Sequence, residues 1–120
     1  MPLPPIIAEN TATAAEWSDD SFVGILHETY RWDHNKFVDF EQAVLQIAGN
    51  EHDDATVAAL FRIFDYLMVL FTSHFDPSDY FTFKSLTIEE IFECRDRVQT
   101  MFSAYFIRDS STTNLHDQTA

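Results

Sequence analysis

The interior of this chain holds almost no residue that interrupts a helix, and this feature constrains its fold most. The 120 residues include two glycines and four prolines, and three of the prolines lie within the first five positions. Turn-rich β folds need such residues between their short strands. Twelve phenylalanines supply ample apolar surface to bury. The sequence therefore predicts an all-α domain with a true core, rather than a β fold or a disordered chain.

The first predicted helix runs from about residue 27 to residue 48. Apolar residues recur there at spacings of three, four and seven, which is the pattern of an amphipathic helix, and Gly49 is expected to end it. The sequence leaves an alternative open: a separate short helix capped at Ser18, followed by a break near Asp33. The inner face of the continuous helix would consist of Tyr30, Phe37, Phe40, Val44 and Ile47.

The second and third predicted helices have clearer boundaries. The second is expected to begin at Asp53 or Asp54, whose carboxylate suits a helix N-terminus, and to end before Pro77. The third is expected to begin at Thr87, because Thr87 and Glu90 have the spacing of a capping box, and to end near residue 107. Their inner faces are predicted to consist of Val57, Leu60, Phe61, Phe64, Leu67, Met68, Phe71 and Phe75, and of Ile88, Ile91, Val98, Phe102 and Tyr105.

Three long amphipathic helices bury their apolar faces most simply as an up-down helical bundle. A short fourth element is expected from residues 17–26, or from a second copy of the chain that completes the bundle as a homodimer. Residues 1–16 are predicted to form an N-terminal arm with little to bury. Residues 17–108 would form the bundle, and residues 109–120 a flexible polar tail.

The charge of the chain restricts its partners. Twenty Asp and Glu against seven Lys and Arg give a formal net charge of −13. Such a surface repels nucleic acid and anionic membranes, so direct binding to either is not expected. A metal ion or a basic protein would be attracted, although the simplest role of such charge is to keep a domain soluble.

Cysteine content and the N-terminus indicate the compartment. The single cysteine, Cys94, excludes an intrachain disulfide and gives no thiolate zinc site. The first residues lack the basic region and long apolar run of a secretory signal. The longest apolar stretch, near residues 66–71, is too short to cross a bilayer. A cytoplasmic protein without membrane contact is expected.

Histidines are the first candidates for a functional site. His34 lies four residues after Tyr30 and three before Phe37, and His74 lies three residues after Phe71, so both are predicted on inward helix faces. Two imidazoles that enter a bundle from different helices are a plausible start for a metal site, which makes His34 and His74 the candidate metal ligands. The competing interpretation is a core ring held by a hydrogen bond. His27 would share the face of His34 if the first helix were continuous.

Catalytic signatures are missing from the sequence. It has no glycine-rich phosphate loop, no nucleophile elbow and no paired-cysteine motif. Its basic residues are scattered and form no stripe. No catalytic residue is predicted, and a binding role is favoured over an enzymatic one.

Three segments in this order resemble the hemerythrin-like domain family. Residues 17–25 read Trp-Ser-Asp-Asp-Ser-Phe-Val-Gly-Ile, which is similar to the Trp-led arm of bacterial members. Residues 33–37, Asp-His-Asn-Lys-Phe, resemble the segment with the first-helix iron ligand. Residues 74–79, His-Phe-Asp-Pro-Ser-Asp, resemble the His-Phe-x-x-Glu-Glu run that ends the second helix. The resemblance implies a helical bundle and spans about residues 17 to 106.

The chain departs from this family at most of the iron ligands. Two extra residues separate Ile25 from His34, Ser78 occupies the place of the bridging glutamate, and residues 88–106 contain no histidine. The fourth helix of the family, with its own ligands, has no counterpart. A di-iron site needs most of these donors together. The resemblance therefore implies a degenerate member that binds one metal, such as iron, or none, with a sensory or binding role rather than oxygen carriage.

Two functional hypotheses follow from the sequence. The first is a hemerythrin-like binding protein with a residual metal site at His34 and His74. The second is an acidic interaction factor, such as an inhibitor, immunity or antidefence protein, that docks on a basic partner. Acidic clusters near residues 19–20, 51–54 and 76–79 have aromatic neighbours that suit an interface.

Overall fold

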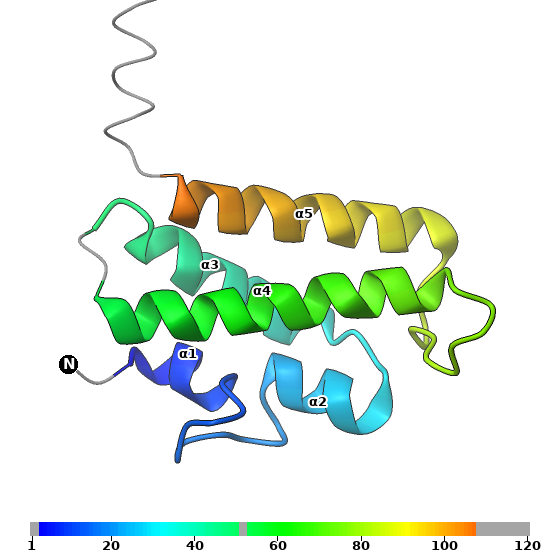
Figure 1. The fold of residues 1–120 in the computed structure, drawn as a ribbon, viewed down its shortest axis with the longest axis horizontal. Helices are drawn as coiled ribbons and strands as arrows, with labels where there is room; N and C mark the ends of the chain where they lie inside the picture. Colours follow the sequence, from blue (N-terminus) through cyan, green and yellow to red (C-terminus); the bar gives the residue numbers. More distant parts are fainter. Residues whose placement is uncertain (1–2, 51–52, 108–120) are drawn as a thin grey trace, which may run out of the picture.

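The computed structural model describes residues 3–50 and 53–107, and these residues form an all-α protein (Figure 1). They contain no strand, so the predicted all-α class is confirmed, whereas the up-down bundle stays a prediction. The helices are α1 (Pro5–Glu9), α2 (Phe22–Thr29), α3 (His34–Ile47), α4 (Asp54–His74) and α5 (Ile88–Phe106). The predicted tail, residues 109–120, lies outside the described residues.

The long helices pack side by side, and the short ones cover one side of them. Helix α5 packs against both α3 and α4, while α1 packs against α3 and α4 from the other side and α2 packs against α3. Figure 1 shows α4 across the front, with α5 along one side of it and α1 and α2 along the other. The second and third predicted helices are present as α4 and α5, and α3 covers part of the first, while the short helices α1 and α2 add to them.

The predicted continuous helix from residue 27 to residue 48 is wrong, because the chain turns between α2 and α3. Tyr30 adopts the left-handed conformation with φ of 61° and ends α2. The side chain of Asp33 then accepts a hydrogen bond from the Lys36 amide at 3.1 Å and starts α3. The alternative with a break near Asp33 is therefore confirmed, although Ser21 rather than Ser18 caps the short helix, by accepting from the Gly24 amide at 3.0 Å.

The expectation that residues 1–16 have little to bury is also wrong. Ile7 is fully buried in the core, and α1 brings it there. Asn10 fastens this segment to α2, because its side-chain oxygen accepts a hydrogen bond from the Val23 amide at 2.7 Å. Its amide nitrogen donates to the Ile6 carbonyl at 2.8 Å. The N-terminal segment is thus part of the packed domain.

Helices α4 and α5 begin where their caps predict. Asp53 accepts a hydrogen bond from the Thr56 amide at 2.8 Å. Thr87 and Glu90 form the complete capping box, with reciprocal bonds of 2.8 and 3.2 Å. In each case a side-chain oxygen satisfies an amide that the first helical turn leaves without a partner.

Aromatic rings pack together around the turn between α2 and α3. Trp32, in the turn between α2 and α3, contacts Phe22 and Phe37 at centroid distances of 4.8 and 4.9 Å. The loop before α5 packs down onto this cluster through Phe81 and Phe83. The remaining buried side chains of the long helices include Phe40, Val44, Leu60, Ile63, Leu67, Phe71, Ile91, Val98, Met101, Phe102 and Tyr105.

Helix α4 has the length and composition of a membrane-crossing segment, contrary to the expectation that no apolar stretch is long enough. Core helices of soluble proteins have the same properties, so this is weak support for a membrane segment. Leu60, Ile63 and Leu67 bury one side of α4 within the domain. The cytoplasmic location and the absence of membrane contact stay predictions.

Candidate functional site

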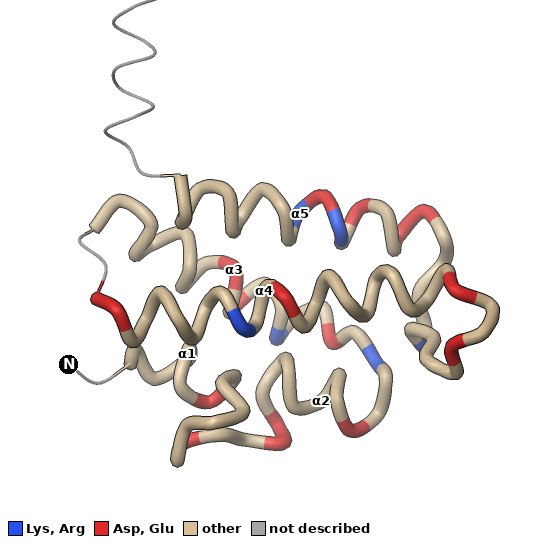
Figure 2. The backbone as a smooth tube through the Cα atoms, in the orientation of Figure 1, with Lys and Arg blue, Asp and Glu red and all other residues tan. Residues whose placement is uncertain are grey.

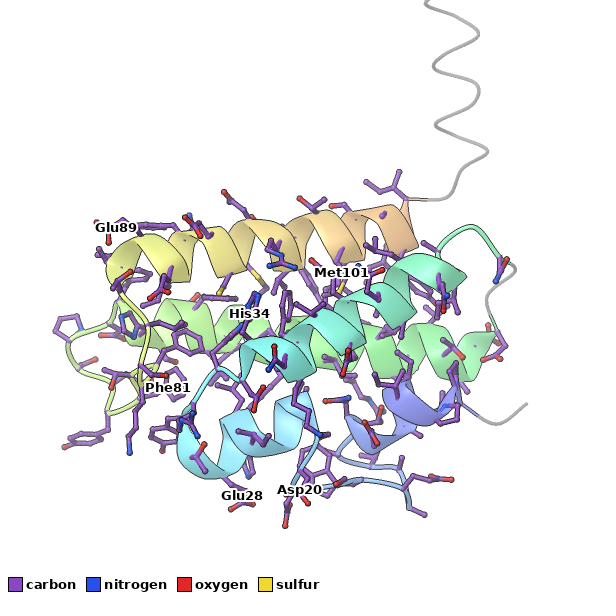
Figure 3. All side chains as sticks on the ribbon, turned by 180° about the vertical axis from the view of Figure 1, so that it is seen from behind. Asp20, Glu28, His34, Phe81, Glu89 and Met101 are labelled. Carbon is purple, nitrogen blue, oxygen red and sulfur yellow. The ribbon has the colours of Figure 1, made fainter. Side chains whose placement is uncertain are left out.

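His34 is exposed, which corrects the expectation that the bundle encloses it. It is the first residue of α3, where Figure 3 labels it. Because the chain turns just before it, the inward positions of this helix begin one turn later, and Phe37 and Phe40 occupy them. The continuous-helix pattern that placed His34 inward does not exist in the fold.

His74 is half-buried at the end of α4 and has a structural contact. Its Nδ1 atom accepts a hydrogen bond from the Phe83 amide at 3.1 Å. Its ring lies 5.0 Å from the ring of Phe75 and 5.6 Å from that of Phe83. This contact matches the competing interpretation of a histidine held by a hydrogen bond, and it ties the loop before α5 to the end of α4.

The donor set does not fit a di-iron centre. No group of three or more His, Cys, Asp or Glu residues is arranged to hold a metal in the part of the chain that the structure describes. Glu41, a buried carboxylate on α3, is already bound by Arg97 of α5, whose Nε donates to Glu41 Oε2 at 3.1 Å. The metal role of His34 and His74 stays a prediction that this geometry does not support.

A different surface brings aromatic and acidic side chains together where α4 ends and α5 begins. Phe75 and Phe92 stack with centroids 5.5 Å apart and planes 15° apart. Both remain 43% exposed, and Ile88, one turn before Phe92, is 53% exposed. We call this the aromatic–acidic surface. It consists of Phe75, Ile88 and Phe92 with the exposed carboxylates of Asp76, Asp79, Glu89, Glu93 and Asp96.

The sequence pattern misassigned two of the three apolar members of this surface. Phe75 and Ile88 were expected on inner faces, because each continues the apolar spacing of its helix. Phe75 follows the last residue of α4 and Ile88 is the first residue of α5. The described structure packs little against their outer sides, so both stay half exposed. A helix-end position is the signal that distinguishes them from core residues such as Phe71 and Ile91.

One carboxylate of the aromatic–acidic surface has a lowered pKa. Hydrogen bonds from the hydroxyl and amide of Ser78 lower the pKa of Asp76, so it is ionised at neutral pH. Figure 2 shows acidic residues in the loop that follows α4 and along the first half of α5. Within the described residues, the Arg97–Glu41 contact is the one ion pair, and it lies outside this surface.

Phe92 already contacts a cation. The guanidinium carbon of Arg95 lies 5.1 Å from the centre of the Phe92 ring, which is cation–π distance. The ring is only half covered. The surface therefore combines a half-exposed aromatic pair, one ring of which contacts a guanidinium, with neighbouring Asp and Glu side chains.

Comparisons with protein-family models, with curated proteins and with solved structures give no match for this chain.

Proposed function

We propose that this protein is an acidic interaction factor that docks on a basic protein through the aromatic–acidic surface. The stacked and half-exposed pair Phe75 and Phe92, set among exposed Asp and Glu side chains, is the observation that carries the proposal. Aromatic residues at the centre of an interface commonly supply most of its binding energy. The surrounding carboxylates would speed the encounter with a positively charged partner and select against neutral ones.

Charge favours a protein over other macromolecules as the partner. At a net charge of −13 the chain repels phosphate backbones and anionic lipid headgroups. Lys and Arg side chains of a partner would place cations near the carboxylates and their apolar stems against the rings. The proposal keeps the sequence-based expectation of a non-enzymatic role.

The test is affinity capture with matched variants. Immobilised protein is compared with the double variant Phe75→Ala/Phe92→Ala and with Phe61→Ala as a control. Phe61 is 57% exposed on α4, but it lies 14 positions from Phe75, which is about 21 Å along the helix axis. All three proteins are first checked for native helicity by circular dichroism. Captured proteins are identified by mass spectrometry, and the strongest candidate is purified and titrated by calorimetry.

We expect one basic protein to bind wild type and Phe61→Ala alike and to bind the double variant about 10- to 100-fold more weakly. Raising the salt from about 0.1 to 0.5 M should weaken binding, because the screening length becomes shorter than the about 10 Å found at 0.1 M and attraction between the opposite charges is reduced. Equal binding to the double variant, or affinity that is insensitive to salt, would show that another surface or another force is responsible.

A further inference from the structure

A cavity of about 370 Å³ lies between the segment after α1, helix α2 and helix α4. Its volume is near the lower end of the range for small-molecule sites. None of its lining residues belongs to the aromatic–acidic surface, so it is a separate feature of the fold. The N-terminal segment closes it through Asn10 to Thr13 and Trp17. The cavity therefore exists only because this segment folds back onto the helices.

Three aromatic rings and two aliphatic side chains form its walls. Trp17 and His27 have ring centroids 6.5 Å apart at an interplanar angle of 77°. His27 and Tyr66 have centroids 6.3 Å apart at 59°. Because the rings are steeply inclined to one another, they surround a space rather than stack and fill it. Val23 and Ile63 complete an apolar interior that suits a flat ring.

One cation lines this interior. The Arg62 guanidinium donates to the Thr13 hydroxyl at 3.2 Å, and within the described residues no carboxylate pairs with it. Its fork has five N–H donors, so most of them are available to a ligand, and its geometry matches a carboxylate. Tyr66 adds a neutral hydroxyl. Burial, and secondarily Tyr30, raises its pKa, and its oxygen lies 3.4 Å from His27 Nδ1.

We propose that this cavity binds a small aromatic monocarboxylate. Arg62 would receive the carboxylate, and Trp17, His27 and Tyr66 would contact the ring. The negative net charge and Glu28 at the lining disfavour multiply charged anions such as phosphates, because repulsion grows with ligand charge. A single carboxylate experiences the least repulsion while still engaging the guanidinium. This binding activity is independent of the proposed docking function.

The experiment uses the full chain and three probes that share one ring system: indole-3-acetate, its uncharged amide, and tryptamine. Binding is measured by calorimetry and by amide chemical shifts, at about 0.3 M salt to screen the long-range repulsion. We expect indole-3-acetate to bind at least about 10-fold more tightly than the amide, because its carboxylate makes a charge-assisted contact with Arg62 where the amide makes a neutral one. The largest shifts should occur at Trp17, His27 and Tyr66.

Two variants with the same change in charge make the test specific. Arg62→Gln should weaken indole-3-acetate about 10-fold or more and leave the amide unchanged. Lys36→Gln, on α3 and outside the cavity lining, should change either affinity less than about 2-fold. Arg62 is exposed, so its replacement should leave the helical signal intact.

Several outcomes would overturn the proposal. These are a preference for tryptamine, no binding of any probe up to about 1 mM, shifts that map elsewhere, and equal losses in the two variants. The Phe75→Ala/Phe92→Ala variant should bind indole-3-acetate like wild type. A failure of the docking proposal would therefore leave this result unaffected, and the converse also holds.

Discussion

Replacing Gly24 by alanine in α2 should destabilise this protein, although the same change stabilises most helices. Alanine is favoured over glycine inside a helix by about 0.8–1 kcal/mol. At Gly24, however, an added Cβ would lie 2.2 Å from the Ser18 carbonyl oxygen and 2.8 Å from Asp19 backbone atoms. Backbone atoms cannot rotate away as a flexible side chain can. The segment before α2 would have to move by on the order of 1 Å to reach normal contact distance.

That movement would disturb the hydrogen bonds that start α2. The Ser18 carbonyl accepts from the Ser21 hydroxyl at 2.7 Å and from the Ser21 amide at 3.1 Å. The same hydroxyl caps the helix at the Gly24 amide. Each bond contributes about 1 kcal/mol, so weakening two or three of them costs about 2–3 kcal/mol. After the gain in helix propensity, we expect a net loss of about 1–2 kcal/mol in the free energy of unfolding.

The measurement is urea unfolding followed by circular dichroism at 222 nm, with Gly49→Ala as the matched control. An alanine Cβ at Gly49 would meet no atom within 4 Å, and Gly49 has no positive φ. Its replacement should be neutral or stabilising by about 0.5 kcal/mol, because it reduces the entropy of the unfolded chain. Gly24→Ala should also melt about 5 °C or more below wild type. If its midpoint equals or exceeds wild type at an unchanged slope, the close approach of the Ser18 backbone to α2 is refuted.

Three further predictions concern the helix caps and the buried thiol. Thr87→Ala removes one half of the capping box and should lower the free energy of unfolding in urea by about 1 kcal/mol, whereas Thr87→Ser should lower it little. Equal losses in the two variants would contradict a capping role. The bond from the Thr56 amide lowers the pKa of Asp53, so the stabilisation that Asp53 contributes is present above the unfolded pKa and is lost as pH falls through the folded pKa. Asp53→Asn keeps an acceptor and should flatten the decline of unfolding midpoints between about pH 5 and 3. Parallel declines in the two proteins would refute this linkage. Burial raises the pKa of Cys94 to about 11. An aromatic disulfide reagent at about pH 8 should therefore label Cys94 at least about 100-fold more slowly in native protein than in urea. Similar rates would show an accessible thiolate.

Helices α4 and α5 could be located from the sequence because their signals are local. Asp53, Thr87 and Glu90 act on amides within three residues of themselves. The apolar spacing that follows them is long enough to define one buried face on each helix. These local signals can be recognised in the sequence without knowledge of contacts between distant residues.

The turn between α2 and α3 could not be chosen from spacing alone. The apolar pattern runs through residues 27–48 and suits one helix, but contacts with residues outside this segment favour a turn. The Lys84 amide donates to the Tyr30 carbonyl at 2.8 Å, and Trp32 enters the core between Phe22 and Phe83. The turn gives up helical hydrogen bonds and buries the Trp32 ring in the core.

The candidate sites show the same division. The sequence identified the acidic charge and the general presence of aromatic neighbours near residues 76–79. It placed His34 inward because it assumed a continuous helix, and it placed Phe75 and Ile88 in the core because it could not foresee which helix ends lack a cover. The cavity beside Arg62 was missed entirely, since residues 10–13, which help to close it, belong to the arm that was expected to have little to bury.

The sequence by itself determined the all-α class, the starts of α4 and α5, and the negative charge, because each depends on composition or on residues within one helical turn. Only the tertiary structure decided where α2 ends, that α1 is buried, and which imidazoles and rings reach solvent. Those outcomes depend on contacts between residues far apart in the chain, such as Asn10 with Val23 and His74 with Phe83. Packing selects among several locally acceptable conformations, and its free energy is available only when the distant partners meet.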